Sequence, residues 1–142
     1  MSRVRAPSVA IVIPAYNAEK TLKRTLQSVI DSVEQARTNI PDLSAEIAVV
    51  DDASTDGTAA LIRSWASRYP YIKAVFNKEN RGPGFSRNEG VRKTTGTYLF
   101  FLDADDVYYP NHVSVCLEHL MDRDDLGYVF TTLHVDMPIH DQ

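Results

Sequence analysis

Three aspartates lie within four residues directly after a short apolar run. The run is YLFF at residues 98–101, and the carboxylates belong to Asp103, Asp105 and Asp106. Carboxylates this close repel one another, and oxygen-rich clusters suit Mg²⁺ or Mn²⁺, whose remaining positions are filled by water and substrate phosphates. The segment therefore predicts either a divalent-cation site for a phosphate-bearing ligand or a solvated acidic turn.

A second acidic pair follows another apolar run. Asp51 and Asp52 come after residues 47–50 and precede the letters STD, any one of which can cap a helix beginning near Gly57. One cap uses one side chain. At least one of the two carboxylates is therefore expected to be free to accept hydrogen bonds from a base or a ribose.

Two further loops carry residues suited to ligand binding. Gly82 and Gly84 flank a proline before a predicted helix, where unpaired backbone N–H groups and Arg87 can meet an anion. Neither a dinucleotide fingerprint nor a P-loop is present. Tyr16 and Asn17 follow a strand that ends in proline. An aromatic ring at such a place can stack on a nucleobase or simply cover the edge of the core.

Apolar runs that alternate with helical patterns must position these loops. The runs are rich in Val, Ile, Tyr and Phe and span residues 9–13, 47–50, 71–76, 98–102 and 128–132. The stretches between them have helical period, apart from one linker-like piece at residues 37–44. Continuous apolar strands are typical of a parallel sheet covered on both faces. The expected fold class is α/β, a doubly wound, mostly parallel sheet flanked by helices.

The four loops are expected to meet at one edge of this sheet. Ligands of open parallel sheets bind at the carboxyl ends of the strands, and each loop follows a predicted strand. Together the loops supply an aromatic ring, two groups of carboxylates and an arginine. A nucleotide-sugar with a divalent cation would use every one of them.

Four segments, in this order, closely resemble the family 2 glycosyltransferases: IVIPAYNAEKTL, VVDDASTDGT, NRGPGFSRNEG and FLDADDVYYP. The resemblance covers the chain from about residue 9 to residue 120. It implies the Rossmann-like GT-A fold of nucleotide-diphospho-sugar transferases. It also implies inverting transfer of a sugar, commonly from a UDP-sugar, to an acceptor hydroxyl with Mg²⁺ or Mn²⁺ bound. The acceptor can be a saccharide, a lipid or a protein.

The resemblance implies roles for individual residues. Asp103 and Asp105 match the DxD pair, with Asp105 the direct metal ligand and Asp103 a ribose or sugar contact that can also reach the metal. Asp52 matches the acidic residue that hydrogen-bonds the uracil ring, and the role of Asp106 is open. The expected contacts to the donor nucleotide are Pro14, Tyr16, Glu19, Asp51, Asp52, Arg87, Asn88 and Asp103.

The general base of an inverting transfer is not assigned. In this family it comes from an acidic motif downstream of DxD, and the context of the aspartates at 122, 124, 125 and 136 does not match that motif. We expect residues 1–142 to be a single family 2 domain, truncated after the DxD segment and the fifth strand. The base would then lie beyond Gln142.

Two alternative functions remain open from the sequence. One is a donor-binding fragment or interaction module without turnover. The other is a phosphatase of the haloacid-dehalogenase type, whose DxDx[TV] opening DADDV also resembles. In that case Asp103 would be the nucleophile and Asp105 the acid.

Composition excludes several other classes. The 142 residues are 44% hydrophobic and 24% charged, which is ordinary for one globular domain. The net charge is −4 without a dense basic run, so no nucleic-acid partner is expected. No apolar run approaches the roughly 18 residues of a membrane span. The lone Cys116 cannot form an internal disulfide. A cytoplasmic location is expected, or the cytosolic face of a membrane in a longer parent protein.

Overall fold

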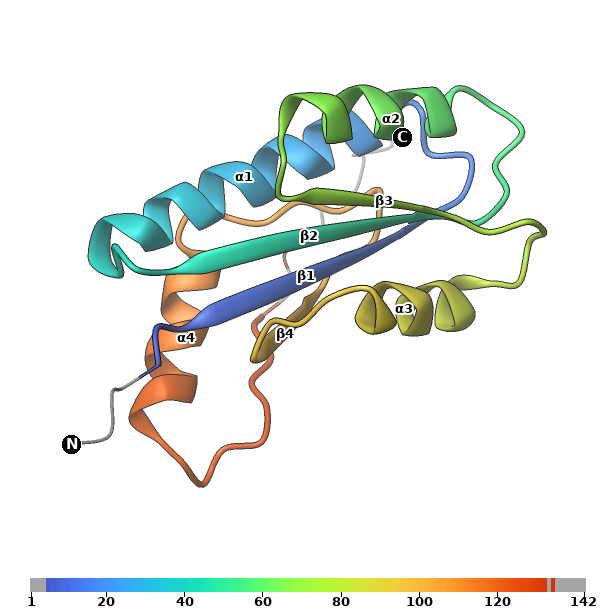
Figure 1. Ribbon diagram of the computed structural model, residues 1–142. Helices are drawn as coiled ribbons and strands as arrows, with labels where there is room; N and C mark the ends of the chain where they lie inside the picture. Colours follow the sequence, from blue (N-terminus) through green and yellow to red (C-terminus); the bar gives the residue numbers. More distant parts are fainter. Residues whose placement is uncertain (1–4, 133, 135–142) are drawn as a thin grey trace, which may run out of the picture.

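The computed structural model describes residues 5–132 and 134, and it confirms the alternation of strands and helices (Figure 1). The strands are β1 (Ser8–Ala15), β2 (Ser44–Asp51), β3 (Ile72–Phe76) and β4 (Tyr98–Phe101). The helices are α1 (Leu22–Asn39), α2 (Thr58–Arg68), α3 (Pro83–Arg92) and α4 (His112–Asp122). The predicted runs at residues 9–13 and 47–50 lie within β1 and β2, and those at residues 71–76 and 98–102 contain β3 and β4.

The strands form one parallel sheet in the order β3-β2-β1-β4. The chain proceeds outward from β1 through β2 to β3, and then returns to place β4 on the other side of β1. Doubly wound sheets bind ligands where the strand order reverses, outside the carboxyl ends of the strands. In this sheet that point lies between β1 and β4.

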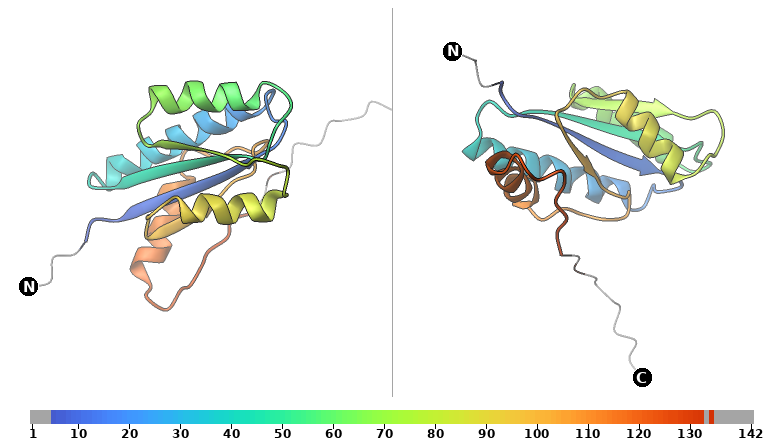
Figure 2. Two further views of the ribbon diagram at one scale, coloured as in Figure 1. Left: turned by 45° about the vertical axis from the view of Figure 1, so that its right-hand side comes forward. Right: turned by 90° about the horizontal axis from the view of Figure 1, so that it is seen from below.

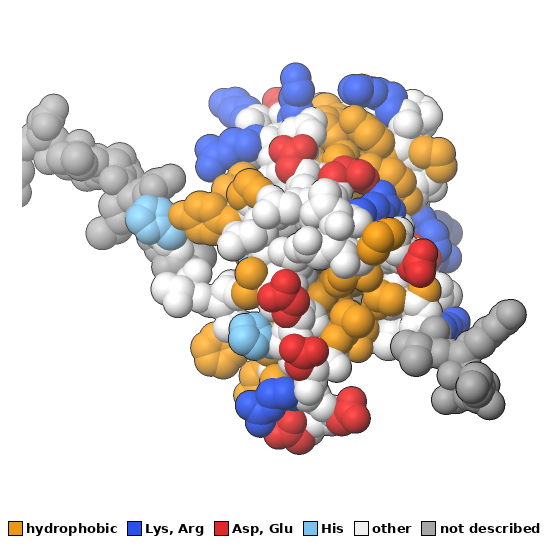
Figure 3. Space-filling view, turned by 90° about the vertical axis from the view of Figure 1, so that its left-hand side faces the viewer, with side chains coloured by type: hydrophobic (Ala, Val, Ile, Leu, Met, Phe, Trp, Pro, Cys, Tyr) orange, Lys and Arg blue, Asp and Glu red, His pale blue; other side chains and the backbone are white. Residues whose placement is uncertain are grey.

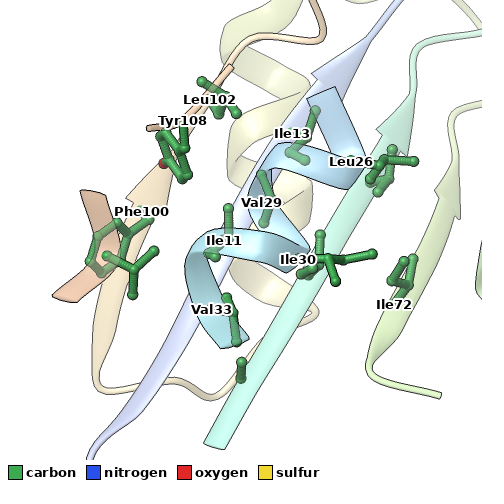
Figure 4. Packing of buried hydrophobic residues seen from close by; sticks show 14 of the residues in the cluster. Ile11, Ile13, Leu26, Val29, Ile30, Val33, Ile72, Phe100, Leu102 and Tyr108 are labelled. Carbon is green, nitrogen blue, oxygen red and sulfur yellow. The ribbon is translucent and has the colours of Figure 1, made fainter. Parts of the chain in front are cut away.

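The main core lies between the sheet and the helices α1, α2 and α4. Ile11 and Ile13 point from β1 toward α1, where Val29 meets them (Figure 4), and all three side chains are fully buried. Each such burial contributes about 1.5–3 kcal/mol to stability. The apolar faces of the helices therefore fix how the strands, and the loops that follow them, are placed.

Helix α3 covers the opposite face of the sheet, as the two views of Figure 2 make clear. The contact is close because Gly90 has no side chain. A Cβ atom there would clash with Cγ1 of Val12 and lie 3.3 Å from Cγ2 of Val50. The helix backbone therefore packs directly on β1 and β2.

The prediction of a fifth strand at residues 128–132 is wrong. This segment forms no strand, and the side chains of Tyr128 and Phe130 are 76% and 87% exposed. Apolar alternation predicts a strand only where a neighbouring edge supplies backbone partners, and here no such pairing forms.

The linker expected at residues 37–44 is shorter in the structure and spans residues 40–43. Helix α1 continues to Asn39, and β2 already begins at Ser44. The Arg37 side chain explains the longer helix in part, because its Nε donates to the carbonyl of Leu43 over 3.2 Å and joins the last turn to the following loop.

The end of the sheet where the strands begin has a mixed surface. Figure 3 shows the end where the strands begin. Basic side chains gather along one rim there, acidic ones elsewhere, and hydrophobic side chains reach the surface between them. Within the described part of the chain, no helix combines the length and hydropathy needed to span a bilayer.

Candidate functional site

An open hollow of about 610 Å³ lies beyond the carboxyl ends of β1 and β4. Its walls come from the loop after β1, the loop after β4 and the start of α3. Six of the predicted site residues line it: Pro14, Tyr16, Glu19, Arg87, Asp103 and Asp105. The structure therefore brings together side chains up to 91 positions apart in sequence, at the point where the strand order reverses.

The hollow opens because β4 stops pairing with β1 before β1 ends. Paired residues on β1 run only from Val9 to Val12, and the amide of Leu102 makes the last contact, 3.2 Å from the carbonyl of Val12. Pro14 follows on the same side of β1 and has no N–H group to leave unpaired there. A proline in a central strand is thus accommodated where the two strands separate.

The DxD segment forms an exposed carboxylate cluster at this opening. Asp103, Asp105 and Asp106 each offer an oxygen within 4.8 Å of the others. Partial burial, followed by repulsion from Asp105 and Asp103, raises the pKa of Asp106. This set of oxygen donors fits Mg²⁺ or Mn²⁺, which take carboxylate and water ligands.

One cation of the protein already reaches the cluster. Nη2 of Arg87, on α3, donates to Oδ1 of Asp103 over 2.7 Å. Both side chains are partly exposed, at 37% and 53%. The ion pair therefore links the α3 wall of the hollow to the loop after β4.

Two threonines of the α1 region hold the acidic loop from beneath. The hydroxyl of Thr25 is fully buried and lies 2.9 Å from the carbonyl of Ala104 and 2.7 Å from that of Asp106. The hydroxyl of Thr21 donates to the same Ala104 carbonyl over 2.8 Å. Sequence reasoning missed both residues. The available signal was a polar residue at position 25 between the apolar positions 22, 26 and 29.

Tyr108 anchors the far end of the same loop. Its hydroxyl donates to the carbonyl of Phe101 over 2.9 Å, and its ring stacks on His112 with centroids 4.0 Å apart. Burial, with a smaller effect of Cys116, raises the pKa of the Tyr108 hydroxyl. The loop that carries the carboxylates is thus fixed at both ends.

The carboxylate of Asp52 is buried beneath the third loop instead of facing the hollow. It accepts hydrogen bonds from the amides of Arg81 (2.9 Å) and Gly82 (2.8 Å) and from Nδ2 of Asn77 (2.9 Å). Burial raises the pKa of Asp52, but these bonds outweigh it and hold the pKa below its ordinary value. The anion at the glycine-containing loop is thus the protein's own carboxylate. A role of Asp52 toward a base stays a prediction.

Two other predicted residues lie away from the hollow. Asp51 is buried, with Oδ1 at 3.4 Å from the amide of Ser54. Asn88 is exposed on α3 and does not line the hollow. Their contacts to a nucleotide likewise stay predictions.

The first and second loops are joined by hydrogen bonds. Oδ1 of Asn17 accepts from the amide of Thr55 over 2.9 Å, and the Asn17 amide donates to Oγ of Ser54 over 2.9 Å. Oε2 of Glu19 accepts from the amide of Gly57 over 2.8 Å at the start of α2. The loop that carries Tyr16 is therefore tied to the second loop and to the start of α2.

The N-cap residue of helix α2 is Gly57, so the prediction that Ser54, Thr55 or Asp56 caps this helix is wrong. Asp56 lies one residue before the N-cap and still bonds the first helical residue. Its Oδ1 accepts from the amide of Thr58 over 2.9 Å, and this and further hydrogen bonds lower the pKa of Asp56 despite some burial. The loop before it includes Ala53 at φ 60°, in the left-handed region that favours glycine. The second loop is therefore a tightly constrained turn.

The downstream aspartates that the structure describes lie away from this hollow. Asp122 ends α4, Asp124 is exposed beyond it, and Asp125 pairs with Arg123 over 2.6 Å. None of the three lines the hollow. Asp136 lies outside the described residues.

Sequence comparison places the chain among sugar transferases. The model of glycosyl transferase family 2 matches residues 10–140. Chondroitin synthase of Escherichia coli is 34% identical over 128 residues, which are 90% of this chain and 17% of that protein. The putative teichuronic acid biosynthesis glycosyltransferase TuaG of Bacillus subtilis is 32% identical over 117 residues, 82% of this chain and 43% of that protein. The chain thus spans less than half the length of either relative.

Two solved structures have the same fold. The mannosyltransferase PcManGT of Pyrobaculum calidifontis, in complex with GDP-Man and Mn²⁺, matches with a TM-score of 0.69 at 27% identity over 82% of this chain and 33% of its own. TarS of S. aureus matches with a TM-score of 0.67 at 24% identity over 81% of this chain and 32% of its own. These likenesses confirm the GT-A fold.

The extent of the family match also decides between the two interpretations of DADDV. A dehalogenase-type phosphatase would share only that segment, whereas the family model spans all four strands and all four loops. On this ground the chain belongs to glycosyl transferase family 2.

Proposed function

We propose that the hollow binds a nucleoside-diphosphate sugar, and that the chain is the donor-binding part of an inverting, metal-dependent glycosyltransferase. The carrying observation is that Arg87 and the carboxylates of Asp103 and Asp105 line one hollow at the reversal point of the sheet. A diphosphate with its cation needs both kinds of group. The arginine pairs with the negative diphosphate, and the carboxylates bind the positive ion.

Each wall of the hollow has a proposed role. Tyr16 is exposed at the tip of β1 and stacks on the nucleobase, while Glu19 steadies this loop through its bond to Gly57. Arg87 donates to the diphosphate. Asp105 and Asp103 hold the divalent cation, which when bound would offset negative charge on the departing diphosphate.

Transfer proceeds by displacement at the anomeric carbon through an oxocarbenium-like state. Inversion requires a general base that takes the proton of the acceptor hydroxyl on the face opposite the leaving diphosphate. The described residues offer donor-side groups for this reaction. Transfer to a saccharide, lipid or protein acceptor is therefore proposed for the whole protein, and donor binding for this chain.

The proposal also specifies the nucleobase of the donor. The family resemblance favours a UDP-sugar, whereas the structural relative PcManGT holds GDP-Man. We propose UDP, because the resemblance covers all four loops. The cytoplasmic location also stays a proposal, supported by a single, buried Cys116.

Calorimetric titration of the 142-residue chain tests the proposed function. UDP is expected to bind more tightly than GDP in the presence of Mn²⁺, and UDP binding should weaken when the metal is removed. Asp105→Asn is expected to weaken UDP binding at least about tenfold with Mn²⁺ and to leave the metal-free affinity unchanged, because only the metal contact is lost.

Asp124→Asn serves as the matched control, since it removes an exposed carboxylate outside the hollow. It should bind UDP like the unsubstituted chain. Failure of the unsubstituted chain to bind either nucleotide would refute the proposed function. Equal metal-dependent affinities for Asp105→Asn and the control would refute the metal assignment.

A further inference from the structure

We infer that Arg87 is an exchangeable counter-ion, paired with Asp103 when the site is empty and with the donor's diphosphate when it is filled. The exchange makes the arginine oppose binding of the metal alone and favour binding of metal and donor together. This inference rests on the proposed function and goes beyond it, because it couples the two ligands through one side chain.

The ion pair between Arg87 and Asp103 carries the first step. The guanidinium of Arg87 lies 2.7 Å from Oδ1 of Asp103, which is itself within 4.8 Å of oxygens from Asp105 and Asp106. A cation that enters this cluster meets a positive charge already bound to one of its oxygens. The guanidinium must therefore move away, or the ion must accept a like-charged neighbour.

The walls of the hollow supply the second step. Arg87, Pro83 and Tyr16 line the same hollow as the acidic cluster, so a diphosphate bound there lies within reach of the guanidinium. Guanidinium groups bind phosphate through two parallel hydrogen bonds. The bound diphosphate can thus replace Asp103 as the partner of Arg87 and release that carboxylate to the metal.

The exchange requires movement of a side chain and not of the helix. Helix α3 is fixed by the contact of Gly90 with Val12 and by the hydrogen bonds that the loop before the helix donates to Asp52. The Arg87 side chain itself is 37% exposed. An exposed side chain on a fixed helix can change partners without cost to the fold.

Coupling of this kind has a measurable sign. If Arg87 pairs with Asp103 only while no donor is bound, removal of the arginine strengthens the binding of Mn²⁺ measured without UDP. The same change weakens the binding of UDP in saturating Mn²⁺. Positive coupling between two ligands means that each raises the affinity of the other by the same factor. That factor should fall when the arginine is removed.

The test titrates the 142-residue chain with Mn²⁺ alone, with the free ion measured by electron paramagnetic resonance, and then with UDP in saturating Mn²⁺. Arg87→Gln is expected to raise the affinity for Mn²⁺ alone about two- to fivefold, the range of a partly exposed ion pair. It should lower the affinity for UDP about tenfold. A variant with a damaged fold would lower both affinities, so the opposite signs identify the exchange.

Two further variants separate the exchange from a general effect of charge. Arg92→Gln removes an arginine of the same helix that pairs with Glu89 and does not line the hollow, and it should change neither affinity. In an Asp103→Asn background, Arg87→Gln should no longer strengthen Mn²⁺ binding. If Arg87→Gln still raised the Mn²⁺ affinity in that background, the effect would come from the positive charge of Arg87 at a distance and not from its ion pair with Asp103. That result would overturn the inference.

The inference can fail separately from the proposed function. If the unsubstituted chain binds Mn²⁺ and UDP but Arg87→Gln leaves the affinity for Mn²⁺ alone unchanged or lower, only the exchange is refuted. If the unsubstituted chain binds neither ligand, the proposed function fails, and the exchange fails with it.

Discussion

Two acidic segments that look alike in the sequence differ sharply in the folded chain. Asp51 and Asp52 follow β2, and Asp103, Asp105 and Asp106 follow β4. The first pair is buried, and Asp52 is neutralised by three hydrogen-bond donors of the protein. The second group is exposed, and Arg87 donates to one of its members.

The difference indicates that the carboxylate of Asp52 stabilises the fold, whereas the exposed cluster is suited to bind a cation. Protein donors lower the pKa of Asp52, whereas burial and neighbouring carboxylates raise the pKa of Asp106. A buried carboxylate with a full set of donors stabilises the loops around it. An exposed cluster with too few donors keeps its attraction for a cation.

The largest expected effect on stability comes from breaking the buried site. Asp52→Asn should destabilise the chain by about 2–3 kcal/mol. The carboxylate accepts from two backbone N–H groups, one at each oxygen, whereas the carboxamide keeps one oxygen and leaves one N–H group unpaired. Urea unfolding measures the loss. Asp42→Asn, at an exposed position, is the control and should unfold like the original chain. An unchanged midpoint for Asp52→Asn would mean that the buried bonds contribute nothing.

A smaller loss is expected when the support beneath the exposed cluster is removed. Thr25→Val keeps the shape of the side chain but removes the hydroxyl that reaches the carbonyls of Ala104 and Asp106. We expect about 1–2 kcal/mol of destabilisation in urea and weaker Mn²⁺ binding, since the loop loses its anchor. Thr38→Val, at an exposed position of the same helix, should change neither quantity. Normal Mn²⁺ affinity in Thr25→Val would show that the loop holds its shape without this anchor.

The smallest effects should appear in the pH dependence of stability, where the two segments have opposite signs. The pKa of Asp52 is below its ordinary value of 3.8, so its contribution is present above that value and is lost as the pH falls through the folded pKa. The raised pKa of Asp106 makes its ionised form unfavourable above 3.8 and relieves this as the pH falls.

Urea midpoints between pH 3 and pH 7 can separate these two contributions. Asp52→Asn should flatten the acid loss of stability. Asp106→Asn should raise stability at pH 7 by less than about 0.5 kcal/mol and leave stability near pH 3 almost unchanged, so that the loss between these two pH values becomes slightly larger. A loss of stability at pH 7 for Asp106→Asn would contradict the view that this carboxylate is repelled by its neighbours.

The fold was largely predictable from local patterns, and the one wrong strand has a physical reason. Continuous apolar runs such as residues 9–13 and 47–50 predict buried parallel strands, because both faces must be covered. The run at residues 128–132 has strand-forming residues but no paired neighbour in the structure. Pairing is a property of the sheet, which local composition does not contain.

The candidate site was predictable as a set of loops but not as a set of contacts. Because ligands bind at the carboxyl ends of parallel strands, Tyr16, Arg87 and Asp103 could be predicted to lie near one another, and all three line the hollow. The spacing of residues could not tell that the amides of Arg81 and Gly82 would meet Asp52, or that Thr25 would support the acidic loop. Such contacts depend on tertiary packing between loops that are distant in sequence.

The bare backbone at Gly90 has a consequence for how this domain tolerates change. The same helix turn that rests on Val12 and Val50 leads back to Arg87, and the two strands beneath it end in the loops of Tyr16 and Asp52. A larger side chain in the middle of either strand would lift the helix and shift the arginine relative to both loops. Interior substitutions far from any ligand can therefore retune the spacing of the whole pocket at once.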